Sequence, residues 1–295
     1  MGIGSLARTA ADDPIKAWFL VQQRFAPALL LRRLETASRR KGLSRPAFLL
    51  SFDCDTDRDI DTGWDVHARL MEMGIMPVYA VPGENLRRGA AVWRRIADTG
   101  AEFINHGYRE HTIYENGRYV STVFYNHLSR DEKEADILDG HNTVSDVVGQ
   151  KPDGFRAPHF GTVQSSAELF QLHECLARLG YRYSTSTVPY VALRHGPATR
   201  KFGLMELPVT GCPDYPLTIL DSYSFRFAAN GPGSQTYLSQ MGRWAELLAS
   251  GRIFFVNIYA DPSQVADWPE FFDAVRQLAP FARTSYRHVL DEIAL

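Results

Sequence analysis

The sequence is poor in the features that mark several large classes of protein. Its three cysteines, Cys54, Cys175 and Cys212, are odd in number and widely spaced, which fits neither a disulfide framework nor a zinc motif of paired cysteines. The net charge of -2 gives no electrostatic basis for binding nucleic acid. There is no internal repeat, no low-complexity segment and no glycine-rich phosphate loop. What is present, 295 residues of which 45% are hydrophobic, is typical of a globular protein and is enough for one α/β barrel.

Residues 1–45 combine aromatic and leucine side chains with arginine and lysine. Polar residues at 22–24 interrupt the apolar ones, so the segment is not typical of a signal peptide, and nothing approaches the roughly 20 apolar residues of a membrane span. Asp13 followed by Pro14 predicts the start of one or two amphipathic helices. We expect this extension either to pack on the outside of the main domain or to rest on a membrane surface. The cysteine usage favours a reducing compartment, so we expect a cytoplasmic protein, free or peripheral to the inner membrane.

Residues 46–295 alternate short apolar segments with longer amphipathic ones. This alternation predicts right-handed βαβ units, and therefore an α/β domain with a parallel sheet. The segments typical of strands are FLLSF (48–52), MPVYAV (76–81), EFINH (102–106), GFRAP (154–158), YRYSTST (181–187), LMELPV (204–209) and IFFVNIY (253–259). Helical patterns separate most of them, for example LRRGAAVWRRIADTG after the second strand.

Two local signals are stronger than the rest. Ser129 followed by Glu132 is a capping box and predicts the start of a helix. Asn116-Gly117 between β-prone flanks predicts a hairpin, which we assign to residues 112 to about 126, inserted after the third strand. This hairpin is expected either to cover the site or to form a dimer contact.

Polar side chains gather at the C-terminal ends of the predicted strands, which meet on one face of a barrel. They are Asp53 and Asp55 after the first strand, His106 and His111 after the third, Arg156 after the fourth, and Asn257 and Tyr259 in the seventh. Two imidazoles and one carboxylate form a ligand set for a divalent metal ion, zinc or another transition metal, and a second carboxylate is left as a general base. Taken singly, these residues also have structural explanations: a histidine bonded in the core, a histidine exposed on a hairpin, and an arginine in a surface ion pair.

Three segments, FDCD (52–55), PVYAVPGENLRRGAAVWRRIADTGAEFINHGYREH (77–111) and GFRAPHFG (154–161), resemble the first three motifs of the polysaccharide deacetylases. This family is also called the NodB-homology group or carbohydrate esterase family four. The resemblance extends from about Phe48 to His288, and it implies a distorted (β/α) barrel of about seven parallel strands.

The resemblance also implies residue roles. Asp53 matches the catalytic base, Asp55, His106 and His111 match the metal ligands, and Arg156 matches the arginine that orients the base. We expect substrate contacts from four further residues, Tyr108, Pro158, Asn257 and Tyr259.

Three departures from the family pattern leave alternatives open. Cys54 separates the two aspartates, an Asp-x-Asp-Thr form that is similar to lipid-linked formamidoarabinose deformylases and some peptidoglycan deacetylases. The two histidines are five residues apart instead of four, so Glu110 is an alternative to His111 as ligand. The fifth motif lacks its usual histidine, since the strand carries Asn257, and the proton for the leaving amine is then expected from His159 or from protonated Asp53.

These features predict metal-dependent hydrolysis of the amide of an N-acylated amino sugar, in a bacterial cell-envelope glycan or its precursor. One alternative is a deformylase that acts on a lipid-linked formamido sugar. The other is a non-catalytic saccharide-binding protein that keeps the deacetylase barrel. The sequence does not identify the sugar, the acyl group, the native metal or the oligomeric state.

Overall fold

The structure is a computed structural model that describes residues 3–163 and 165–293. The strands are β1 (Ala47–Asp53), β2 (Val78–Val81), β3 (Phe103–Asn105), β4 (Thr112–Glu115), β5 (Arg118–Ser121), β6 (Gly154–Phe155), β7 (Tyr183–Ser184), β8 (Thr199–Lys201), β9 (Leu204–Glu206) and β10 (Phe255–Ala260). The helices are α1 (Ile3–Asp12), α2 (Pro14–Phe25), α3 (Pro27–Arg40), α4 (Asp57–Met71), α5 (Gly83–Arg88), α6 (Ala90–Ala97), α7 (Arg130–Val148), α8 (Ser166–Arg178), α9 (Pro189–His195), α10 (Ser222–Arg226), α11 (Ser234–Ala249), α12 (Pro262–Val265), α13 (Pro269–Arg276) and α14 (Tyr286–Glu292). Short 3-10 helices lie at Tyr125–His127 and Ala279–Phe281.

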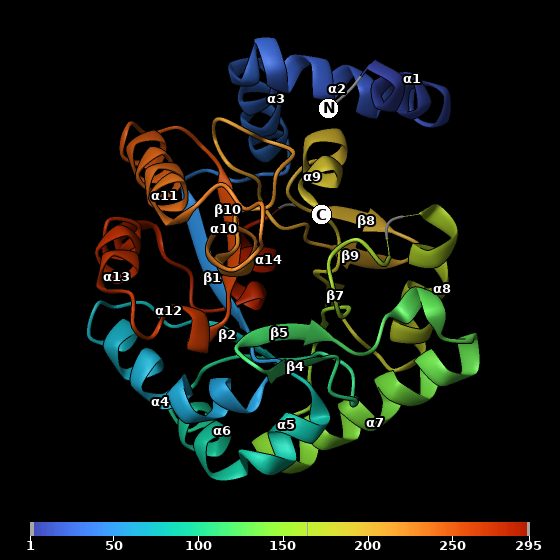
Figure 1. Cartoon of the computed structure of the whole chain (residues 1–295), viewed down its shortest axis with the longest axis vertical. Helices are drawn as coiled ribbons and strands as arrows, with labels where there is room; N and C mark the ends of the chain where they lie inside the picture. The colour runs from blue at the N-terminus through green and yellow to red at the C-terminus, as the bar shows by residue number, and fades with distance from the viewer. Residues whose placement is uncertain (1–2, 164, 294–295) are drawn as a thin grey trace.

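A single curled sheet forms the centre of the molecule, with helices around its outside (Figure 1). Within the described residues its strand order is β10-β1-β2-β3-β6-β7-β9-β8. All neighbours pair in parallel except β8, which is antiparallel to β9. The seven predicted strands are all present, and the expected distorted (β/α) barrel is confirmed. The sequence analysis did not anticipate β8, a short edge strand.

The strand β1 is the best paired part of the sheet. It pairs with β10 over the register Ala47↔Phe255 to Phe52↔Ala260, and with β2 on its other side. Every residue of β1 is buried, as expected of a central parallel strand covered on both faces. This burial explains why the strand reads as an apolar run that ends at a carboxylate.

The strands β6 and β7 are much shorter than their apolar segments predict. Both contain two residues, because the chain leaves the sheet at Arg156 and again at Thr185. Backbone groups beyond β7 find a different partner: Ser186 N and Thr187 N both donate to Oε1 of the buried Glu206, at 2.9 and 3.0 Å. A buried side chain thus takes the place of a neighbouring strand, which satisfies these N–H groups.

The two local signals are confirmed. Ser129 caps α7, and its hydroxyl and the Glu132 carboxylate form the predicted capping box. The strands β4 and β5 form the predicted hairpin, and Asn116 and Gly117 have φ values of 51° and 78°. Two successive positive φ values are the geometry of a type I′ turn, for which this dipeptide is favoured.

One predicted helix is interrupted. The segment LRRGAAVWRRIADTG is divided between α5 and α6 at Gly89. A Cβ at this glycine would lie 2.7 Å from Ile60 Cγ2 and from Trp93 Nε1. The break lets the Trp93 indole pack against this turn and donate to the Asn85 carbonyl at 3.0 Å.

The N-terminal extension packs against the barrel as three helices. The helix α2 begins at Pro14 as predicted, and Asp13 caps it by accepting a hydrogen bond from Lys16 N at 3.0 Å. The helix α1 precedes this start and was not predicted. The buried face of α3 joins the main core through Leu30, Leu31 and Leu34. Among the described helices, none combines the length and the apolar composition that crossing a bilayer requires.

The approach of α7 to the segment after β3 depends on Gly140. A Cβ there would lie 2.6 Å from the carbonyl oxygen of Gly107 and closer still to Asn105 Oδ1. Asn105 in turn donates from Nδ2 to the Ile137 carbonyl at 2.9 Å and accepts from Gly107 N at 3.0 Å. Close packing against this glycine therefore fixes the backbone on both sides of His106.

We predict that Gly140→Ala lowers the free energy of unfolding by about 1–3 kcal/mol, the usual cost of overpacking a filled interior. Chemical denaturation measures the change. Gly242→Ala is the matched control, because Gly242 lies within α11 and an added Cβ there meets no heavy atom within 4 Å. The control is expected to gain about 0.5–1 kcal/mol from the better helix propensity of alanine. Equal stability of the two variants would contradict the packing argument.

Candidate active site

Three strand ends deliver polar side chains to one face of the sheet. Asp53 is the last residue of β1, and Asp55 follows it by two. His106 follows β3 directly, and Arg156 follows β6 directly. His111 comes from a different element, since it immediately precedes β4 of the inserted hairpin. The parallel arrangement thus gathers residues that lie up to about a hundred positions apart in sequence.

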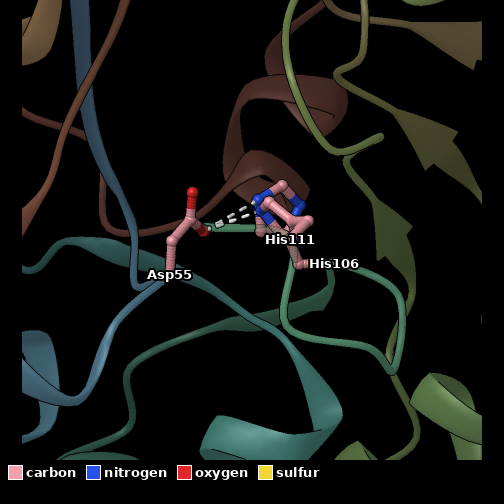
Figure 2. A group of neighbouring side chains, drawn as sticks. All are labelled: Asp55, His106 and His111. Atoms are coloured by element: carbon pink, nitrogen blue, oxygen red, sulfur yellow. Dashed lines mark ion pairs between the residues drawn. The ribbon is translucent and has the colours of Figure 1, made fainter. Parts of the chain in front are cut away.

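Asp55, His106 and His111 converge at one point (Figure 2). One ligand atom from each lies within 4.8 Å of the other two. Asp55 Oδ1 is 3.4 Å from His106 Nε2 and 2.9 Å from His111 Nε2. Donor atoms bound tetrahedrally at about 2.0–2.1 Å from a zinc ion lie about 3.3 Å apart. The separations therefore suit one ion shared by the three side chains.

The polar atoms of this cluster are also unsatisfied without an ion. Asp55 Oδ1, His106 Nε2 and both ring nitrogens of His111 are buried, and apart from the contacts of Asp55 with the two imidazoles they have no hydrogen-bond partner within the described residues. Buried polar atoms nearly always have a partner, so a group of them facing one point indicates a missing ligand. The residues present therefore fit a divalent metal ion.

The hydrogen bonding of His106 selects the tautomer that suits a ligand. Its Nδ1 lies 2.8 Å from the carbonyl oxygen of Arg156, which can only accept, so Nδ1 carries the proton and Nε2 presents a lone pair toward Asp55. Burial alone would raise the pKa of Asp55, but the His111 and His106 imidazoles hold it well below its usual range. Asp55 is consequently ionised, as metal coordination requires.

Glu110, the alternative ligand, is directed elsewhere. Its Oε1 accepts from Arg88 Nη2 at 2.7 Å, and its backbone N donates to Glu84 Oε2 at 2.6 Å. The group that converges with Asp55 and His106 contains His111. The five-residue spacing is accommodated because the chain turns through Gly107, at φ 80°, before it enters the hairpin.

Asp53 lies beside this cluster but has a different partner. Its Oδ1 accepts from Nη1 of the fully buried Arg156 at 2.5 Å, while its Oδ2 is 3.9 Å from His106 Nε2. Arg156 also donates from Nη2 to Ser51 Oγ at 2.9 Å and to Tyr286 Oη at 2.7 Å. The guanidinium therefore fixes one carboxylate oxygen of Asp53 and leaves the other facing the histidines.

A cavity of about 100 Å³ opens in front of these groups. It is lined by Asp53, Asp55, Thr112, Tyr119, Ser121, His159, Phe160, Tyr223, Tyr259, Asp261 and Gln264. A single water needs about 10–15 Å³ of such space. The cavity can therefore hold several waters, or one acyl group with part of a sugar ring. The hairpin supplies one wall through Thr112, Tyr119 and Ser121, and Tyr119 is held there by Ser263 Oγ at 3.2 Å.

Comparison with known proteins gives a match in structure only. No protein-family model matches the chain, and no curated protein matches it. A crystal structure assigned as a polysaccharide deacetylase from Mycobacterium smegmatis superposes with a TM-score of 0.61 at 15% identity, covering 84% of this chain and 89% of the other. A second one so assigned, from Pseudomonas aeruginosa PAO1, has a TM-score of 0.61 at 11% identity over 84% and 90%. The allantoinase Puue also reaches 0.61, at 10% identity over 86% and 91%.

The chain has the polysaccharide deacetylase fold. Identities of 10–15% establish the fold alone, and the fold is shared with a protein whose name refers to a substrate that is not a saccharide. Residue roles within this deacetylase fold therefore have to be argued from the geometry of this chain.

The residues expected to contact substrate differ in their position relative to the cavity. Tyr259 lines the cavity and stacks against Phe160, with ring centroids 4.7 Å apart. Asn257 is fully buried deeper in the barrel, where its Oδ1 accepts from Tyr286 Oη at 2.8 Å and its Nδ2 donates to the Pro208 carbonyl at 3.0 Å. Because Tyr286 also bonds Arg156, Asn257 supports the arginine from within.

Like Asn257, two more of the expected contacts are not part of the cavity lining. Tyr108 packs against Gly83, the first residue of α5, and its carbonyl accepts from Glu84 N at 2.9 Å. Pro158 is buried, and its carbonyl accepts from Thr162 Oγ1 at 2.9 Å. His159 does line the cavity, with Nε2 3.1 Å from the His111 carbonyl oxygen, and it has a φ of 55°.

One acidic residue of the cavity was missed by the sequence analysis. Asp261 follows β10 directly and lines the cavity together with Asp53 and Asp55. Gln264 Nε2 donates to its Oδ2, and burial together with Asp59, Asp55 and Asp53 raises its pKa well above the usual range. The same rule that selected the other strand ends applies to "NIYAD", because positions 257, 259 and 261 point to the same side of the strand.

We predict that Asp55→Ala, His106→Ala and His111→Ala each lose the bound metal, measured by elemental analysis of protein purified without chelators. Each change removes one of the three donor atoms. Glu110→Ala is the control and should keep its metal, since that carboxylate is bound to Arg88. The same metal content in wild type and Asp55→Ala would overturn the ligand set.

Proposed function

We propose that the protein is a metal-dependent hydrolase that cleaves the amide of an N-acylated amino sugar. The observation that carries the proposal is the pairing of two carboxylates with different surroundings in one cavity. Asp55 faces the two histidines, while Asp53 is bonded to a buried arginine. The first arrangement suits a metal ligand and the second a general base, and both roles agree with the deacetylase fold.

The base is oriented before any substrate arrives. Arg156 holds Oδ1 of Asp53, so Oδ2 is the oxygen available to accept a proton from an attacking water in the cavity. A divalent ion held by Asp55, His106 and His111 would supply Lewis-acid catalysis, by polarising the amide carbonyl and lowering the pKa of the attacking water. Because the ligands and the base lie on neighbouring strand ends, the water and the carbonyl are brought together by the same rigid element.

The departing amine needs a proton, and His159 and Asp261 both line the cavity. Burial lowers the pKa of His159 to about 4, so this imidazole is neutral at pH 7 and carries no proton that it can readily give up. Burial and the nearby Asp59 raise the pKa of Asp261 well above its usual range, which favours the protonated acid, and Gln264 occupies only its Oδ2. We therefore assign the proton to Asp261, with protonated Asp53 as the second source. Under this assignment the chain retains an acid without the usual histidine, which favours an enzyme over a non-catalytic barrel.

The walls of the cavity suit a saccharide. Tyr119, Tyr223 and Phe160 offer aromatic faces, while Ser121 and Gln264 offer polar groups. Sugar rings combine an apolar face of C–H groups with hydroxyls at the edge, so both kinds of contact would be used. An N-acetylated and an N-formylated sugar differ by one methyl group, and release of acetate or formate from a panel of amino-sugar substrates is the experiment that separates them. Release of neither acid by metal-loaded protein would overturn the proposed function.

We predict that Asp53→Asn lowers kcat by about a hundredfold or more, the usual contribution of a general base. The amide retains the shape of the carboxylate but cannot accept the proton. Metal content should stay close to that of the wild type, because Asp53 is not one of the three convergent ligands. Loss of the metal in Asp53→Asn would instead indicate that both aspartates bind the ion.

We predict that Asp261→Asn also lowers kcat by about a hundredfold, and that it removes the decline of activity on the alkaline side. The sign follows from the raised pKa: the acid donates only while protonated, so activity falls as the pH rises through that pKa. Asp221→Asn is the control, since Asp221 is also buried with its pKa raised to about 6, but it caps α10 and does not line the cavity. An Asp261→Asn variant with an unchanged pH profile would return the role to His159 or Asp53.

A further inference from the structure

The charge of the chain is divided unevenly between its two parts. Residues 1–45 contain nine lysines and arginines but three aspartates and glutamates, a net charge of +6, although the whole chain has -2. Residues 46–295 therefore carry -8. A charge asymmetry of this size is typical of proteins whose basic segment binds an acidic surface.

The helix α2 presents an apolar stripe that the barrel does not cover. Ile15, Trp18 and Phe25 are 40%, 58% and 80% exposed, and Leu29 at the start of α3 is 48% exposed. With 100° per residue, the three side chains of α2 fall within a sector of about 80° on one side of the helix. Phe25 is the most exposed large hydrophobic side chain among the described residues.

The packing contacts of the extension fix which side remains free. Phe19 is buried against Tyr190 of α9, with ring centroids 5.9 Å apart, and Gln23 Oε1 accepts from Leu217 N at 2.7 Å. Glu35 of α3 accepts from Arg252 Nε at 2.9 Å, which ties that helix to the segment before β10. With these anchors in place, α1 and α2 form the outermost layer at one end of the molecule (Figure 1).

The extension also borders a basic hollow of about 390 Å³ between α3 and α9. Its charged or titratable lining residues are Arg33, Arg40, Lys41, Arg194 and His195. No aspartate or glutamate of the described residues lines it. Arg194 is paired with Asp13 at 3.4 Å, but Arg33, Arg40 and Lys41 form no ion pair within the described residues. Such a hollow can take the phosphate of a lipid headgroup, because these three cations have no carboxylate to neutralise them.

We propose that the N-terminal extension docks the protein on an anionic lipid bilayer. Ile15, Trp18 and Phe25 enter the interfacial layer, where tryptophan and phenylalanine are favoured, and the surrounding cations attract the headgroup phosphates. A second copy of this chain is a poorer occupant of the stripe, because a symmetric dimer built on it would bring two segments of charge +6 together. The proposal is independent of what the cavity hydrolyses.

The test uses full-length protein and sedimentation with vesicles. We expect binding to vesicles of phosphatidylcholine mixed with phosphatidylglycerol, weak binding to phosphatidylcholine alone, and loss of binding at high salt. Trp18→Ser/Phe25→Ser should weaken binding by about tenfold or more. The matched control is Leu138→Ser/Phe170→Ser, which alters side chains that are 44% and 47% exposed on α7 and α8, and it should bind as the wild type does.

A charge variant tests the electrostatic part. Arg40→Glu/Lys41→Glu should weaken binding to the anionic vesicles at least about fivefold for each cation lost, and Arg243→Glu/Arg276→Glu on the barrel should not. Thermal melting verifies that each variant is folded. Equal binding to neutral and anionic vesicles, no binding by the wild type, or equal binding by Trp18→Ser/Phe25→Ser would overturn the proposal. It would also be overturned if analytical ultracentrifugation found a dimer that this double variant alone disrupts.

Discussion

The buried guanidinium of Arg156 is the interaction on which the arrangement of the site depends. Taking a charge out of water costs several kcal/mol unless a partner and hydrogen bonds replace the lost solvation. Here Asp53 supplies the opposite charge, and Ser51 and Tyr286 both accept hydrogen bonds from Nη2. These partners come from β1 and α14, so the arginine ties β6 to both. Its backbone carbonyl meanwhile selects the tautomer of His106, so one residue governs both the proposed base and a proposed metal ligand.

Much of the fold and of this site could be predicted from the sequence, for an identifiable reason. Central parallel strands such as β1 are buried on both faces, so they are recognisable as apolar runs, and their ends are marked by the first charged residue. Asp53, His106 and Arg156 all lie at such boundaries. The hairpin was equally visible, because Asn116 and Gly117 have to adopt positive φ and few other residues do so at low cost.

The parts that were not predicted depend on contacts distant in sequence. The sequence around Asn257 does not show that its side chain is hydrogen-bonded to Tyr286 inside the barrel. Nor does the sequence around β7 show that this strand ends early because Glu206 accepts hydrogen bonds from the N–H groups that follow it. Asp261 was overlooked for a different reason: the apolar run was ended at Tyr259, two residues before the strand delivers its carboxylate. Alternation along β10 does contain that information, since both residues point to the same side.

The strand ends and the inserted segments make separate contributions to specificity. Asp53, Asp55 and Asp261 are held in place by the ends of the strands of the sheet. The fold of this sheet is similar in this chain, in an allantoinase and in two structures assigned as polysaccharide deacetylases. The aromatic walls come from elsewhere: Tyr119 from the hairpin and Tyr223 from α10, where their rings meet edge to face at 6.0 Å. Residues in these connections can change without disturbing β1 or its buried arginine partner. A sheet of this kind can therefore hold the proposed catalytic groups while the substrate is selected by the loops that pack on its outer rim.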